Sequence, residues 1–181
     1  MTMAPERGTR RARSEDSTTL PPAERAREIA LRLLTHAPRS AAQLREGLLA
    51  RGVEPQVADE VIARYIEVGL LDDASLAATI ARTRHAERGA SARIIAMELR
   101  RKGFGDEDIE KALEPLTREV EHESARRLAR ARWERTRGLD RDVRVRRVVA
   151  HLGRKGYSPS LAFALVKELA SVDSEEQMQV D

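Results

Sequence analysis

The 181-residue sequence contains no cysteine, and aromatic residues make up only 3% of it. The absence of cysteine excludes disulfide bonds, thiolate catalysis, iron–sulfur clusters and cysteine-ligated zinc, and it agrees with a reducing compartment. Because aromatic side chains are so scarce, a hydrophobic core must be built from packed aliphatic residues.

Long apolar runs are also missing. The longest stretch without a charged residue, 156–166, is much shorter than the roughly 20 apolar residues that a membrane-spanning helix needs. The N-terminal residues include arginines but no apolar segment of the kind found in cleaved secretory signals. We therefore expect a soluble cytoplasmic protein without a membrane partner.

Positive charge is concentrated in one part of the chain. The net charge is only +3, but residues 117–170 contain 14 basic and 7 acidic side chains, a net charge of +7. Of the 33 basic residues, 29 are arginine, whose planar guanidinium suits phosphate and carboxylate groups equally. The composition is therefore compatible with either a nucleic acid or an acidic protein as partner.

An internal repeat predicts the architecture. Three segments combine a leucine, a basic residue three positions later and then a glycine, and their glycines stand 51 and 53 residues apart: 48–52, 99–103 and 152–156. Apolar residues at spacings of three and four lead into each glycine, which is typical of an amphipathic helix that ends in a glycine cap. A second amphipathic pattern follows each glycine, and a further helical pattern precedes each pair. The fold class predicted is all-α, with three tandem three-helix repeats in an elongated, curved array.

The limits of the parts follow from composition. We expect a disordered N-terminal arm at residues 1–22 and an acidic flexible tail at residues 171–181. Between them we expect three three-helix repeats, at residues 23–71, 72–116 and 117–170, of which the third is basic. Helix start signals support this division: Ser40 and Gln43 fit a capping box, Pro55 and Pro159 fit first-turn positions, and Asp72 fits an N-cap.

Residues able to perform catalysis are not arranged in a recognisable pattern. The four histidines show no metal-ligand spacing, and no phosphate-binding or nucleophile motif is present. We therefore expect no catalytic residues, no metal, no cofactor and no enzymatic activity. Trp133, the only tryptophan, lies on the apolar side of its helical pattern and is interpreted as a core residue rather than a platform for stacking bases.

The basic third repeat contains the candidate binding residues. Its few glutamates cannot neutralise its arginines, so we expect an exposed positive surface that contacts a polyanion or an acidic groove; a role in solubility alone is the alternative. The residues chosen for this surface are Arg126, Arg127, Arg130, Arg137, Arg144, Arg147, Arg154 and Lys155.

Three segments together resemble the RecX family of bacterial recombination regulators. They are residues 69–77 (GLLDDASLA), 95–103 (IAMELRRKG) and 152–158 (LGRKGYS), and the resemblance extends from about Ala26 to Leu169. Leu76 departs from the family, which often has an aromatic residue after the Asp-Asp pair. The arginine-containing N-terminal arm lies outside the shared pattern.

This resemblance implies a non-enzymatic modulator of the RecA recombinase. Family members bind the RecA filament on single-stranded DNA and suppress strand exchange, ATP hydrolysis and co-protease activity. It thus implies the RecA filament as partner and leaves open whether the arginines contact RecA or single-stranded DNA directly. We also expect a monomer. The alternative function is a stand-alone DNA-binding regulator, because two helices joined at a glycine also resemble a helix-turn-helix unit.

Overall fold

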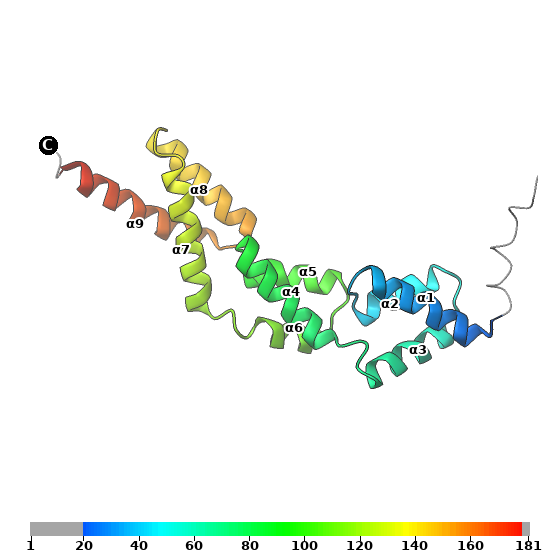
Figure 1. Cartoon of the computed structure of the whole chain (residues 1–181). Coiled ribbons are helices and arrows are strands. Elements are labelled where there is room, and N and C mark those ends of the chain that lie inside the picture. Colours follow the sequence, from blue (N-terminus) through cyan, green and yellow to red (C-terminus); the bar gives the residue numbers. More distant parts are fainter. Residues whose placement is uncertain (1–19, 179–181) are drawn as a thin grey trace, which may run out of the picture. The chain divides into compact units, whose positions relative to one another are not determined.

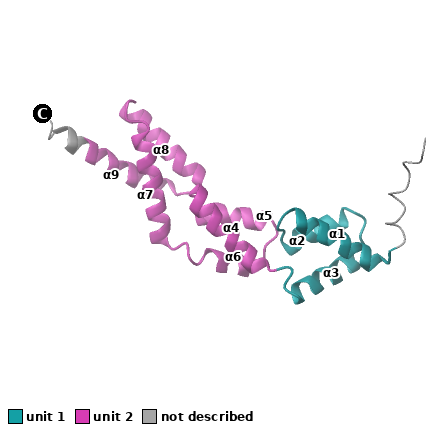
Figure 2. Ribbon diagram, in the orientation of Figure 1, with its two compact units in different colours: residues 1–71 teal, residues 72–181 magenta. Residues whose placement is uncertain are grey.

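The computed structural model describes residues 20–178 of the chain. Within this range the chain forms nine α-helices and no strand, which confirms the predicted all-α fold class (Figure 1). The helices belong to two compact units that divide between Leu71 and Asp72 (Figure 2). The disordered arm is expected at residues 1–22, and residues 1–19 of it lie outside the described part of the chain. The first helix begins at Pro22.

The first unit contains one three-helix repeat: α1 (Pro22–His36), α2 (Ala41–Leu49) and α3 (Pro55–Glu67). The predicted capping box starts α2: the Ser40 hydroxyl accepts the backbone N–H of Gln43, and the Gln43 side chain accepts the backbone N–H of Ser40. One apolar face of each helix turns inward and forms a core of Ala26, Ala30, Leu33, Leu44, Leu48, Ala58, Val61, Tyr65 and Leu71.

The second repeat opens the second unit and contains α4 (Asp73–Arg88), α5 (Ala92–Arg101) and α6 (Asp106–Leu113). The Asp72 side chain accepts the backbone N–H of Ser75 at 2.8 Å, so it caps α4 as predicted. The core of this repeat consists of Ala77, Ala81, Ala90, Ile95, Ala96, Leu99, Phe104, Ile109 and Ala112.

The third repeat follows with α7 (Arg118–Glu134), α8 (Arg141–Lys155) and α9 (Pro159–Met178). Trp133 is 2% exposed, which confirms its interpretation as a core residue. The other buried residues of this core are Ala125, Ala129, Val148, Leu152, Tyr157, Ala162, Leu165, Val166 and Ala170.

The middle helix of every repeat runs into the predicted glycine. Gly52, Gly103 and Gly156 have φ values of 77°, 78° and 91°, in the left-handed region that a side chain disfavours. Each repeat has a leucine four positions before this glycine. The residue after the glycine donates its backbone N–H to the carbonyl of that leucine, at 3.1–3.2 Å. This is the hydrogen bond of a Schellman cap, and it turns the chain into the third helix of the repeat.

The second and third repeats are joined by a polar and closely packed contact. The backbone N–H of Ser91 donates to the carbonyl of Lys155 at 2.9 Å, and that of Ala92 donates to Glu121 Oε1 at 2.8 Å. A Cβ atom on Gly156 would collide with Ser91 Oγ and with the side chain of Ile94. The end of α8 therefore lies directly against the start of α5, which only glycine permits.

The expected flexible tail begins at Ser171, and in the structure α9 continues past this residue to Met178. No glycine or proline interrupts the helix after Pro159. Asp173 also holds this last part in place, because its Oδ2 accepts Trp133 Nε1 at 2.9 Å and Arg144 Nη1 at 2.6 Å. The guanidinium of Arg144 in turn lies 3.7 Å from the ring centroid of Trp133. Residues 179–181 lie outside the described part of the chain.

The caps generate a first prediction. Replacing Gly103 by valine forces a β-branched residue into φ 78° and should lower the free energy of unfolding by about 1–2 kcal/mol. Thermal denaturation followed by circular dichroism measures the change. Gly138→Val is the control, because φ of Gly138 is not positive and a Cβ there meets no atom within 4 Å. Equal melting temperatures for the two variants would contradict the cap assignment.

The contact between Trp133, Arg144 and Asp173 generates a second prediction. Arg144→Ala removes the stacked guanidinium and leaves the Asp173 carboxylate with one donor fewer, so it should cost about 1.5–3 kcal/mol in urea unfolding. Arg147→Ala, on the exposed side of the same helix, should change stability by less than about 0.5 kcal/mol. Similar unfolding midpoints for the two variants would show that Arg144 has no structural role.

Candidate partner-binding surface

The first two repeats pair much of their charge internally. In the second repeat Arg84 donates two hydrogen bonds of 2.8 Å to the carboxylate of Glu98, and this guanidinium lowers the pKa of Glu98. In the first repeat the carboxylate of Asp59 lies 2.6 Å from Arg45, which lowers the pKa of Asp59 by hydrogen bonding. These two pairs therefore compensate the charge of Arg45 and Arg84 within their own repeats.

The third repeat differs because most arginines of α7 and α8 form no salt bridge with a described residue. Thr117 caps the start of α7, where its hydroxyl accepts the backbone N–H of Val120, and Gly156 ends α8. The two helices pack against each other through their apolar faces, with Trp133 and Val148 in the shared core. Apart from the buried Arg144, their arginines are wholly or partly exposed on the remaining faces.

One concave site lies between the second and third repeats, and we name it the inter-repeat cleft. It has a volume of about 310 Å³. It is formed by the end of α4, by α7 and by the end of α8. Its lining residues are Ala86, Glu87, Arg88, Gly89, Arg127, Leu128, Ala131, Arg132, Arg135, His151 and Lys155.

A second concave site is also lined by Arg132, and we name it the outer groove. It has a volume of about 400 Å³ and is formed by α7 and α8 alone. It is lined by Arg132, Val143, Arg146, Arg147, Ala150 and Arg154. Arg132 lines both sites, so the cleft and the groove adjoin at this side chain.

The structure places four of the eight chosen residues around these sites. Arg127 and Lys155 line the inter-repeat cleft, while Arg147 and Arg154 line the outer groove. Arg130 is exposed but lines neither site.

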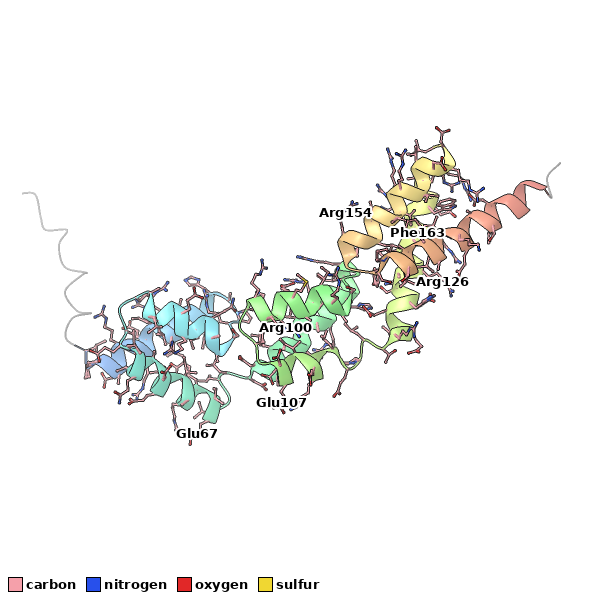
Figure 3. All side chains as sticks on the ribbon, turned by 180° about the vertical axis from the view of Figure 1, so that it is seen from behind. Glu67, Arg100, Glu107, Arg126, Arg154 and Phe163 are labelled. Carbon is pink, nitrogen blue, oxygen red and sulfur yellow. The ribbon has the colours of Figure 1, made fainter. Side chains whose placement is uncertain are left out.

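Two further chosen residues are engaged by carboxylates. Arg126 lies 3.8 Å from Glu123 and 3.5 Å from Glu168, on the α9 side of the repeat, away from Arg154 on α8 (Figure 3). Arg137 lies 3.2 Å from Glu134. Because a surface salt bridge is worth little, both could exchange these partners, but their charge is partly compensated.

The choice of Arg144 as a surface residue is wrong. It is 8% exposed, stacks on Trp133 and pairs with Asp173. Counting arginines cannot distinguish it from Arg147, which lies three residues later on the exposed side. The periodicity of α8 could have done so, because Arg144 stands four residues before Val148 and eight before Leu152, both buried.

Sequence reasoning also missed several lining residues. Arg132, Arg135 and Arg146 belong to the basic run but were not chosen, and Arg88 and His151 carried no signal of their own. Arg88 stands in the second repeat, so only the packing of two repeats brings it to the cleft.

The electrostatics of the cleft act on His151. Burial lowers the pKa of this imidazole, and the positive charges of Lys155, Arg132, Arg154 and Arg135 lower it further. Glu87 is the acidic residue among those that line the cleft. The site therefore combines several fixed cations with a histidine whose pKa is lowered by burial and, to a smaller extent, by those cations.

The described residues give no indication of reaction chemistry. No group of three or more histidine, aspartate or glutamate side chains is placed to hold a metal ion within this part of the chain. No helix among the residues searched is long and apolar enough to cross a membrane. What the arrangement does provide is a concave, positively charged surface for binding an anion.

Comparison with known proteins identifies the family. Residues 26–64, 72–113 and 119–166 match, in order, the first, second and third three-helix domains of RecX. A protein of Streptomyces coelicolor named regulatory protein RecX is 43% identical over 155 residues, which cover 86% of this chain and 82% of the relative. A protein of the same name from Thermobifida fusca is 44% identical over 144 residues, which cover 80% of this chain and 78% of the relative.

Solved structures agree with this result. The crystal structure of RecX from Lactobacillus salivarius has a TM-score of 0.72 at 21% identity and covers 82% of this chain and 97% of its own, which supports the fold. Another crystal structure of a regulatory protein RecX has a TM-score of 0.68 at 27% identity and covers 81% of this chain and 72% of its own. The chain belongs to the RecX family of regulatory proteins.

Proposed function

We propose that this protein binds the RecA filament on single-stranded DNA and inhibits its strand exchange, ATP hydrolysis and co-protease activity. The observation that carries this proposal is the ordered match of all three three-helix repeats to the domains of RecX, whose members are named regulatory proteins. In this function the protein is a monomeric binding protein without a cofactor and performs no catalysis.

The basic surface of the third repeat supports the proposal physically. A filament on DNA presents phosphates and acidic side chains, and arginine forms bidentate hydrogen bonds with both. Arg126 in α7 and Arg137 in the turn after it form salt bridges with described carboxylates, whereas the other exposed arginines of α7 and α8 form none. They are therefore available to anchor the protein electrostatically while the other repeats extend the contact.

Inhibition then follows from occupancy. A protein bound across several filament subunits opposes the rearrangements that strand exchange and ATP turnover require, and it blocks the addition of further subunits. Such a mechanism needs a binding surface and no reacting group.

The competing function is a stand-alone DNA-binding regulator of the helix-turn-helix type. The local charges disfavour it for the second repeat, because the first turn of α6 contains Asp106, Glu107 and Asp108, which would face the phosphates of a major groove. The discriminating measurement is RecA ATP hydrolysis on single-stranded DNA at substoichiometric amounts of this protein. Inhibition supports the proposal, whereas unchanged turnover at equimolar protein overturns it.

Charge reversal generates the third prediction. The triple variant Arg130→Glu, Arg147→Glu and Arg154→Glu should weaken binding to the RecA filament more than tenfold at low salt and should flatten its salt dependence. Filament-bound protein, measured by co-sedimentation across a salt series, gives both quantities.

A matched control separates local from overall charge. Arg27→Glu, Arg82→Glu and Arg101→Glu change the net charge by the same amount at exposed positions of the first two repeats that line neither the inter-repeat cleft nor the outer groove. This control should retain most of the inhibition. Equal inhibition by the two folded triple variants would contradict an anchor in the third repeat.

A further inference from the structure

We propose that the inter-repeat cleft and the outer groove together form a binding track for the phosphate backbone of single-stranded DNA, which the protein uses without RecA. The inference that the bound DNA is single-stranded rests on the proposed function. The inference that the two sites bind a phosphate backbone is argued from the residues that line them. The ligand class is the phosphodiester, and contact is made with the backbone rather than with the bases.

The first argument is the balance of charge around the two sites. Eight cationic side chains line them, compared with the single carboxylate of Glu87. None of the eight forms a salt bridge with a described residue. Arg132, which joins the cleft to the groove, has a buried Nε atom without a hydrogen-bond partner. Such a concentration of uncompensated charge disfavours the empty site and is relieved by an anion.

The second argument is that the cleft is built in advance. Gly89 and Gly156 let the two repeats approach closely: a Cβ on Gly89 would lie 2.7 Å from Leu128 Cδ1, and one on Gly156 would strike Ser91 and Ile94. Hydrogen bonds across the same joint fix the position of Arg88 relative to α7 and α8. A prearranged set of cations binds without the cost of ordering two domains.

The third argument distinguishes a nucleic acid from an acidic protein. A cleft of about 310 Å³ with five cations suits a polymer that brings several charges into a small volume. Successive phosphates of a strand provide one charge about every 3.4 Å along the helix axis of a duplex, whereas a carboxylate brings a single charge on a flexible stem. Because the cleft continues through Arg132 into the outer groove, a linear polyanion can engage both.

The residues that line the two sites favour contact with the DNA backbone over stacking with the bases. Proteins that stack the bases of single strands present aromatic side chains, but no aromatic residue lines the cleft or the groove: Trp133 and Tyr157 are buried, and the exposed Phe163 of α9 lies in neither lining. Apolar lining from Ala86, Leu128 and Ala131 can cover sugar rings. Binding should therefore depend little on sequence and strongly on salt.

His151 adds a proton-linked feature to this track. The charged groups around it are Glu87 and Arg88 from α4, Arg127 and Arg132 from α7, Arg135 at the end of α7, and Arg154 and Lys155 from α8. In the free protein burial and these cations keep its pKa low, so the imidazole is neutral near pH 7. A bound phosphate opposes the cations and raises the pKa, so binding takes up a proton. The affinity for DNA should consequently rise as the pH falls from 8 to 6.

The test measures binding of fluorescently labelled (dT)30 by anisotropy, without RecA. The double variant Arg88→Gln and Arg135→Gln changes two exposed cleft residues, one from each repeat, and leaves the joint intact. We expect its affinity to fall about five- to tenfold in low salt and the slope of log K against log salt to become shallower by about 1.4. Arg82→Gln with Arg118→Gln is the matched control and should bind like the unmodified protein.

His151→Gln provides an independent readout. It should bind (dT)30 at pH 8 about as tightly as the unmodified protein but should lose the increase in affinity toward pH 6. The other three histidines remain in this variant, so a flat profile assigns the proton to His151. A pH dependence that persists in the variant would overturn this part of the proposal.

Competitors identify the ligand class. Unlabelled (dT)30 should displace the labelled strand, whereas millimolar inorganic phosphate should displace little, because a single ion cannot occupy the whole track. Displacement by polyglutamate of equal charge as effectively as by (dT)30 would make the track an acidic-protein site and overturn the proposal. Unchanged affinity of the Arg88→Gln and Arg135→Gln variant would overturn it as well.

The outcome is separable from that of the proposed function. If the unmodified protein inhibits RecA but the cleft variant binds (dT)30 normally, the track is rejected and the regulatory function stands. If the cleft variant loses DNA binding but the unmodified protein leaves RecA unaffected, the track stands and the regulatory function is rejected.

Discussion

The close approach of the end of α8 to the start of α5 is the constraint on which the basic surface depends. Gly156 permits this approach because it has no side chain, and its positive φ also ends α8. One residue therefore caps a helix and joins two repeats. Without this joint Arg88 would not stand beside Arg132 and Lys155, and the cleft would not exist. The local rule that selects glycine at a helix end thus also determines the geometry between repeats.

Much of the fold could be predicted from the sequence because its signals are local. The glycine spacing, the capping box at Ser40 and the N-cap at Asp72 each reflect hydrogen bonds within a few residues, and the structure contains all three. The end of α9 could not be predicted in the same way. A polar and acidic composition is typical of a loose terminus, but the bond from Trp133 to Asp173 spans 40 residues and has no signature in the sequence.

The candidate site was predictable only in part for the same reason. Charge counting located the third repeat, because an excess of arginine is visible in composition. It could not separate Arg144, buried against Trp133, from Arg147, exposed in the outer groove. Charge counting also could not identify Arg88 and His151 as lining residues, because they meet in the cleft only through the packing of separate helices. The helical periodicity of α8 would have corrected the choice of Arg144. Only the tertiary structure identifies Arg88 and His151.

The distribution of carboxylates explains why one repeat is left with positive charge. Arg45 and Arg84 meet acidic partners on a neighbouring helix of their own repeat, which compensates their charge. In the third repeat the one well-buried pair, Arg144 with Asp173, stabilises the packing of α9, so this carboxylate is not available to the exposed arginines. The remaining cations repel one another and oppose folding slightly. Because the aliphatic core and the Trp133 contact stabilise the repeat independently of these side chains, the surface can keep its charge for a partner.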